Sequence, residues 1–171
     1  MRGASRAGGS GGGADRGLDA ALAAEHAAVY AYGVLAARTT GRPRSAMTTA
    51  YNAHRARRDQ LRTMIIAAGG APAEPKAVYE LPITPSSAAQ AVELAVLVER
   101  GVTGAYLELA ASADPALRKM AALVMQECVV RSYSLRPEIE AFPGMPPRTA
   151  PGPTATPAVT PAATPAVTPS Q

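Results

Sequence analysis

Apolar residues recur along the chain at alternating steps of three and four residues, separated by polar and charged positions. This spacing places them on one face of an α-helix and is typical of a helix in a bundle. The first stripe predicts a helix that is capped by Asp15 or Asp19 and runs to about Arg38. Its members are Leu18, Leu22, Glu25, Val29, Tyr32 and Ala36.

A second helix is predicted from about Pro43 to Ala68, where Gly69-Gly70 closes it as a C-cap. Its stripe consists of Met47, Tyr51, His54, Arg58, Leu61 and Ile65. Residues 71–85 then carry prolines at positions 72, 75, 82 and 85 and lack the alternation of a strand. We therefore expect an extended crossover, which at about 3.3 Å per residue can run the full length of a bundle.

Two more helices follow the crossover. The third is capped by Thr84 or Ser86 and ends near Ser112. Its stripe consists of Val92, Ala95, Glu99, Val102, Tyr106 and Leu109. The fourth starts at Asp114-Pro115, an Asp cap followed by Pro at the first helical position, and Pro137 limits it. Its stripe consists of Leu117, Met120, Val124, Glu127, Arg131 and Leu135.

One spacing occurs in both halves of the chain. Glu25 is followed seven residues later by Tyr32, and Glu99 is followed seven residues later by Tyr106. Seven residues are two helical turns, so each Glu and its Tyr lie on the same face. This repeat predicts a duplicated helical hairpin, with the tyrosines in the core and their hydroxyls bonded to central polar groups.

The composition agrees with an all-α protein. The chain has one Phe and no Trp, so its core must be built from small aliphatic side chains, which suit closely packed helices. We expect one domain, a four-helix bundle over residues 15–142. The Gly/Ser-rich residues 1–14 and the Pro/Thr/Ala-rich residues 143–171 are expected to be disordered. The second tail is either a spacer or a ligand for a proline-recognising protein partner.

Charge and cysteine content exclude several classes of function. The net charge of +4 reflects a local cluster of arginines, and no aromatic residues are interleaved with Arg55, Arg57 and Arg62, so we do not expect nucleic-acid binding. The single Cys128 excludes an internal disulfide and is expected to be a buried small hydrophobe. His26 is expected on a surface or an interface. The N-terminus lacks the apolar stretch of a secretion signal, so we expect a cytoplasmic protein outside the membrane.

Four polar residues lie on the apolar stripes near the midpoints of the four predicted helices. They are Glu25, His54, Glu99 and Glu127. Helices of similar length packed side by side bring their midpoints to one level, whatever their direction. Buried carboxylates at one level repel each other, so either a metal ion or positive side chains must neutralise them.

These residues carry a resemblance to a known family. The stretches 24–33, 53–59 and 98–100, which contain Glu25, His54 and Glu99, resemble an actinobacterial ferritin-like domain family of uncharacterised function. The resemblance covers about Leu18 to Gly144 and implies the ferritin-like four-helix fold, with two helical hairpins and a long crossover. The ferritin-like di-iron pattern has a Glu on two helices and a Glu-x-x-His on the other two.

The chain departs from that pattern twice. Tyr51 stands where the second helix would have its Glu, and Val130 stands where the fourth helix would have its His. Two arginines lie instead on the inward stripes, Arg58 on the second helix and Arg131 on the fourth. Together with a protonated His54 they would balance the three glutamates.

Two readings follow from this set. In the first, the protein is a non-catalytic structural or interaction module, expected to form a homodimer, whose core polar network of glutamates, His54, Arg58, Arg131, Tyr32 and Tyr106 holds no cofactor. In the second, it is a metal-binding protein or metal-dependent oxidoreductase. Its ligands for one divalent iron or manganese ion would then be Glu25, His54, Glu99 and Glu127.

Overall fold

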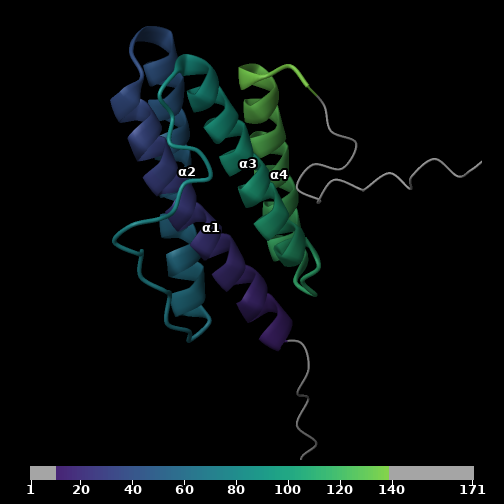
Figure 1. Ribbon diagram of the computed structural model, residues 1–171. Helices are drawn as coiled ribbons and strands as arrows, with labels where there is room; N and C mark the ends of the chain where they lie inside the picture. Colours follow the sequence, from purple (N-terminus) through teal and green to yellow (C-terminus); the bar gives the residue numbers. More distant parts are fainter. Residues whose placement is uncertain (1–10, 139–171) are drawn as a thin grey trace, which may run out of the picture.

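The computed structural model describes residues 11–138, which form four long helices (Figure 1). The described residues contain no strand, so the predicted all-α four-helix fold is confirmed. The helices are α1 Gly11–Arg38, α2 Gly41–Ala67, α3 Ala88–Ala110 and α4 Pro115–Leu135. The predicted tail over residues 143–171 lies outside the described residues, as do residues 1–10.

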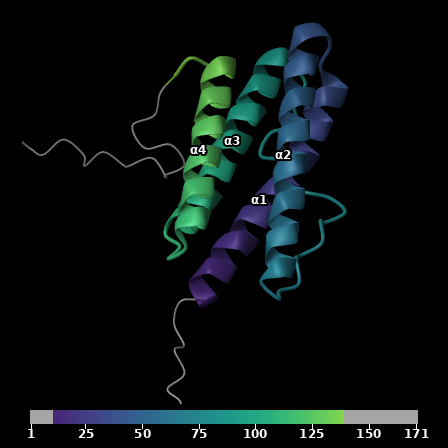
Figure 2. The same ribbon diagram turned by 180° about the vertical axis from the view of Figure 1, so that it is seen from behind.

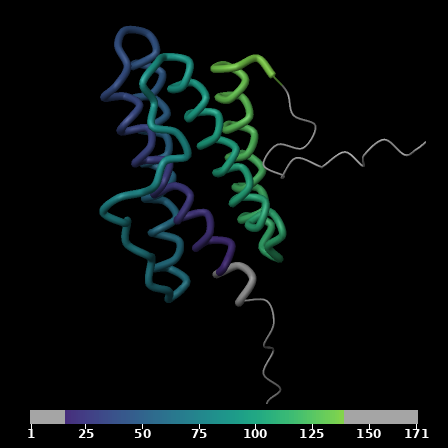
Figure 3. Tube along the Cα trace, viewed as in Figure 1, coloured from purple at the N-terminus to yellow at the C-terminus, as the bar shows by residue number. Residues whose placement is uncertain are grey.

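The helices form two hairpins joined by a long crossover. Followed along the trace, α1 and α2 run in opposite directions, the crossover returns the chain to the other end, and α3 and α4 form the second hairpin (Figures 1 and 3). Helix α1 packs against α2 and α3, and α3 packs against α4, whereas α2 and α4 do not pack directly on each other (Figure 2). Helices α1 and α3 are therefore antiparallel neighbours at the centre of the fold.

The crossover contains no helix, as its prolines predict, and it is attached to the first hairpin at both ends. His26 Nε2 lies 3.1 Å from the carbonyl oxygen of Ala73, and Arg62 forms a 2.8 Å ion pair with Glu74. At the other end, Arg38 donates to the carbonyl oxygen of Pro85 over 3.0 Å. His26, which was expected on a surface or an interface, is not on the surface of the chain, because it is buried and its ring contacts the crossover.

The observed helix termini differ from the predicted ones by a few residues, and side-chain caps mark the starts of α3 and α4. Asp114 caps α4 by accepting from Ala116 N–H, as predicted. Helix α3 is capped by Ser87 and not by Thr84 or Ser86, since the Ser87 hydroxyl accepts from Gln90 N–H. Helix α1 already begins at Gly11, so neither predicted cap, Asp15 or Asp19, stands at its start.

One helix, α1, would also be long and apolar enough to cross a membrane, judged by length and composition over Arg16–Arg38. Core helices of soluble proteins meet the same criterion, and α1 packs between two other helices of the bundle.

Small residues set how closely the central helices approach. A Cβ atom on Gly17 of α1 would lie 3.1 Å from the Leu109 Cα of α3, a distance tighter than ordinary packing. A Cβ atom on Gly101, by contrast, would meet nothing within 4 Å. Gly17 is therefore required by the α1–α3 contact, whereas Gly101 is not required by any contact within the described chain.

This difference predicts opposite effects for two glycine substitutions. Gly17→Val should lower the free energy of unfolding by about 1 to 3 kcal/mol, because the branched side chain overpacks the interface. Gly101→Ala should raise it by about 0.5 to 1 kcal/mol through better helix propensity. Denaturant melts of both variants test the helix contact, and equal effects of the two changes would contradict it.

Candidate functional site

A cluster of charged side chains is buried where three helices meet. Glu25, His54 and Glu99 stand at the midpoints of α1, α2 and α3, and their exposed fractions are 0%, 2% and 0%. Each lies on the apolar stripe of its helix, so packing of the stripes turns all three side chains inward. Of the four residues predicted to meet at one level, these three do so.

His54 lies between the two carboxylates. Its Nδ1 is 2.7 Å from Glu25 Oε2, and its Nε2 is 3.1 Å from Glu99 Oε1. Burial by itself would lower the pKa of His54, but the hydrogen bonds to Glu25 and Glu99 outweigh it and raise the pKa to about 9. His54 is therefore an imidazolium at neutral pH, and both of its N–H groups donate to carboxylates.

Each of two tyrosines on the central helices donates a hydrogen bond to the glutamate of the other helix. Tyr32 of α1 donates its hydroxyl to Glu99 Oε1 of α3 over 2.5 Å, and Tyr106 of α3 donates to Glu25 Oε1 of α1 over 2.8 Å. Tyr32 and Tyr106 stand two turns to opposite sides of the level at which the glutamates meet, because α1 and α3 are antiparallel. Helical side chains lean toward the N-terminus of their own helix, so each Tyr leans back toward this level and reaches the Glu of the other helix. Burial and the neighbouring carboxylates raise the pKa of both hydroxyls, so they remain protonated donors.

Arg131 brings the fourth helix into the cluster, as predicted. Its Nε donates to Glu99 Oε1 over 2.7 Å, and its side chain is 23% exposed. Burial raises the pKa of Glu99, but His54 and then Arg131 outweigh this effect and hold it below its usual range. Glu99 is therefore an anion at neutral pH.

Two predicted members lie outside the cluster. Glu127 is 52% exposed and pairs with Arg57 of α2 over 3.2 Å. Arg58 pairs with the adjacent Asp59 at the surface over 2.7 Å. The predictions that Glu127 and Arg58 lie in the core are wrong, because the rotation of α4 turns Cys128 inward in place of Glu127 and the rotation of α2 leaves Arg58 at its edge.

One oxygen of the cluster has no hydrogen bond within the described chain. This atom is Glu99 Oε2, which is fully buried. The Cys128 thiol interacts with the same carboxylate, and burial followed by the charge of Glu99 raises the thiol pKa, so the sulfur stays protonated. Cys128 is buried, as predicted, but the influence of Glu99 on its thiol was not foreseen. The sequence signal for it is its position four residues after Val124 on the apolar stripe.

The cluster is a network of ion pairs in which the negative and positive charges balance. Two carboxylates, Glu25 and Glu99, face two cations, His54 and Arg131. Among the described residues, no group of three or more His, Cys, Asp or Glu is arranged to hold a metal ion. A protonated imidazole has no lone pair to offer a metal, and both ring nitrogens of His54 already face carboxylates. As arranged, the donor set does not fit a metal ion.

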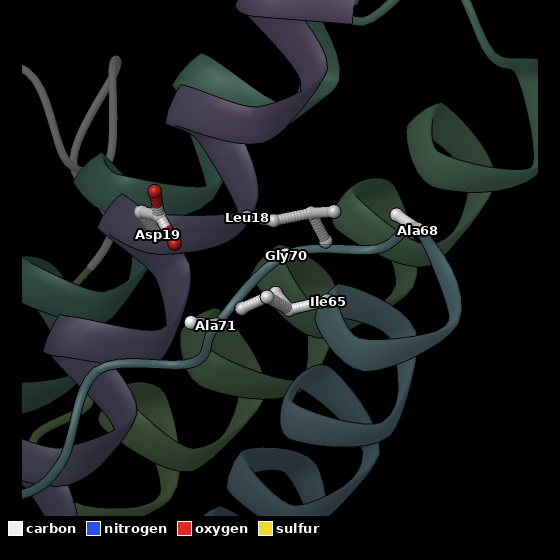
Figure 4. A pocket seen from close by; sticks show the side chains of 6 residues that line it. All are labelled: Leu18, Asp19, Ile65, Ala68, Gly70 and Ala71. Carbon is white, nitrogen blue, oxygen red and sulfur yellow. The ribbon is translucent and has the colours of Figure 1, made fainter.

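A surface hollow of about 180 Å³ lies elsewhere, between α1, the end of α2 and the start of the crossover (Figure 4). It is lined by Leu18, Asp19, Ile65, Ala68, Gly70 and Ala71. The hollow contains no residue of the charge cluster, so it does not give a substrate access to that cluster.

Comparisons with known proteins agree with this architecture. A family model described as "Domain of unknown function (DUF4439)" matches residues 17–147. The chain is also similar to the crystal structure of "a conserved hypothetical protein, rv2844, from Mycobacterium tuberculosis", with 30% sequence identity and a TM-score of 0.71. That match covers 75% of this chain and 98% of the other. No curated protein sequence matches the chain.

Proposed function

The chain belongs to the family described as Domain of unknown function (DUF4439), and we propose that it is a ferritin-like bundle with a structural or interaction role and no catalysis. Two helical hairpins, a crossover that runs the length of the bundle, and inward Glu or His residues at mid-helix support the ferritin-like assignment. In this proposal the Glu–His–Arg cluster takes the structural place that a metal centre has in a catalytic ferritin-like bundle.

One observation carries this proposal, the internal charge balance of the cluster. Glu25 and Glu99 contribute two negative charges, and His54 and Arg131 contribute two positive charges within hydrogen-bond distance. A buried carboxylate pair needs a compensating cation, and here side chains of the same chain supply it. The cluster links all four helices, so its direct effect is to fix how the two hairpins pack together.

Elemental analysis tests the proposal. Protein purified without a polyhistidine tag should contain iron and manganese far below one ion per chain, because the side-chain cations already neutralise the carboxylates. A content near one ion per chain that is lost in Glu99→Ala would overturn the proposal. Glu127→Ala is the matched control, since it removes a glutamate at the surface.

A second candidate function is the binding of one divalent metal ion. It is favoured by Glu99 Oε2, which is buried and has no hydrogen-bond partner within the described chain. For this oxygen to ligate a metal, His54 would have to lose a proton and offer a lone pair, so metal would compete with the proton. Metal content would then rise in protein loaded above pH 9, where His54 becomes neutral. The same elemental analysis on protein loaded at pH 7 and above pH 9 separates the two functions.

A further inference from the structure

Helix α4 is apolar on two opposite faces. Its inner face packs in the core through Leu117, Ala121, Val124 and Cys128. Its outer face exposes three large apolar side chains, Leu123 (49%), Val130 (59%) and Tyr133 (48%). Together with Gln126 they follow steps of three, four and three residues, which places them on one stripe. Helix α4 lies at the edge of the bundle, and none of the other three described helices covers this stripe (Figures 1 and 2).

We propose that residues 139–147 of the same chain pack along this outer stripe of α4. These residues lie outside the described part of the chain, and they begin directly after Glu138. The family model extends through residue 147, so the segment belongs to the family domain although it follows the last helix. The repeats that follow it, from Thr156 onward, are outside the family match.

The sequence of the segment fits the stripe. Ile139, Phe142 and Met145 are spaced by three residues, and three prolines, at positions 143, 146 and 147, accompany them. Proline-rich chains favour the polyproline II helix, which has three residues per turn, so these three apolar side chains would share one edge. Phe142 is the only phenylalanine of the chain.

The length and the starting point of the segment also fit. Tyr133 and Leu123 are separated by ten helical residues, or about 15 Å at 1.5 Å per residue. The six steps from Ile139 to Met145 span about 19 Å at 3.1 Å per residue. The chain leaves α4 at Arg136 in an extended conformation, and Glu138 N–H bonds to the Arg136 carbonyl, which starts a turn. The covalent tether gives the segment a high effective concentration over a partner in solution.

A single tryptophan can report on this packing, because the chain contains none. In Phe142→Trp, we expect the emission maximum at a shorter wavelength than in Val159→Trp, whose tryptophan stands in the repeats outside the family match. Adding Val130→Lys to Phe142→Trp should shift the emission to the red by placing a charge in the contact. Adding Ile66→Lys should not, since Ile66 is equally exposed (60%) but lies on α2.

Three results would overturn the proposal. The first is an emission of Phe142→Trp equal to that of Val159→Trp in water. The second is a blue-shifted emission that Val130→Lys leaves unchanged, which would place the segment on another surface. The third is a blue shift that disappears on dilution together with a change from dimer to monomer in light scattering, which would assign the stripe to a second copy of the chain.

Discussion

Replacing Arg131 with methionine is expected to lower the free energy of unfolding by about 3 kcal/mol at pH 7, which is at the low end of the cost of breaking a buried ion pair. The reason is the charge balance of the cluster. Without Arg131, the single cation His54 faces both Glu25 and Glu99, which are fully buried. The low end applies because Arg131 itself is partly exposed. Urea denaturation of the variant and the parent measures the loss.

A second substitution separates a charge effect from a loss of packing. Arg131→Met combined with Glu99→Gln should recover part of the loss, because the remaining pair of Glu25 and His54 is balanced. Adding Glu127→Gln to Arg131→Met should give no rescue, since Glu127 pairs with Arg57. Rescue by Glu127→Gln and not by Glu99→Gln would show that this account of the pairing is incorrect.

The surface ion pair offers a matched control for the size of the effect. The side chain of Arg57 is 22% exposed, which is similar to the 23% of Arg131. Its partner Glu127, however, is 52% exposed, whereas Glu99 is fully buried. Arg57→Met should therefore cost no more than about 1 kcal/mol. Equal losses in Arg57→Met and Arg131→Met would mean that burial of the carboxylate partner does not determine the cost.

The stability of the protein is expected to fall as the pH rises from 6.5 to above 9, and His54 is the cause. Its pKa is about 9 in the folded protein, where hydrogen bonds to Glu25 and Glu99 outweigh burial, and about 6.5 in the unfolded chain. A group whose pKa is higher in the folded than in the unfolded state stabilises the folded protein. This contribution is complete below the pKa of the unfolded state and is lost as the pH rises through the pKa of the folded state. The difference of about 2.5 units corresponds to about 3 kcal/mol.

The variant His54→Gln isolates this contribution. It should be less stable than the parent at pH 6.5, and the difference between the two chains should shrink by about 3 kcal/mol up to pH 9.5. Both chains keep Cys128, whose raised folded pKa adds the same loss at alkaline pH to each, so this contribution cancels in the comparison. A difference that stays constant over this pH range would mean that His54 is not charged in the folded protein.

Much of the fold could be predicted because helix periodicity and capping are local properties. The apolar stripes and the Asp114-Pro115 start specify helices whose observed bounds differ from the predicted ones by a few residues, and the prolines of the crossover exclude a fifth helix there. The repeated Glu and Tyr, seven residues apart in Glu25–Tyr32 and Glu99–Tyr106, predicted that the tyrosines bond to central polar groups. The antiparallel packing of α1 and α3 then determined that each Tyr bonds to the Glu of the other helix.

The membership of the charge cluster was decided by helix rotation, which periodicity does not specify uniquely. On α4, the steps Val124–Glu127–Arg131 and Val124–Cys128–Arg131 both alternate three and four residues, so a stripe can contain either Glu127 or Cys128. Packing of α4 against α3 buries Cys128 and turns Glu127 toward solvent and Arg57. The sequence by itself thus determined that α1, α2 and α3 carry a buried polar side chain at mid-length, namely Glu25, His54 and Glu99. Only the tertiary structure decided that two carboxylates and two cations meet there, because rotating a helix by one residue exchanges a buried side chain for an exposed one.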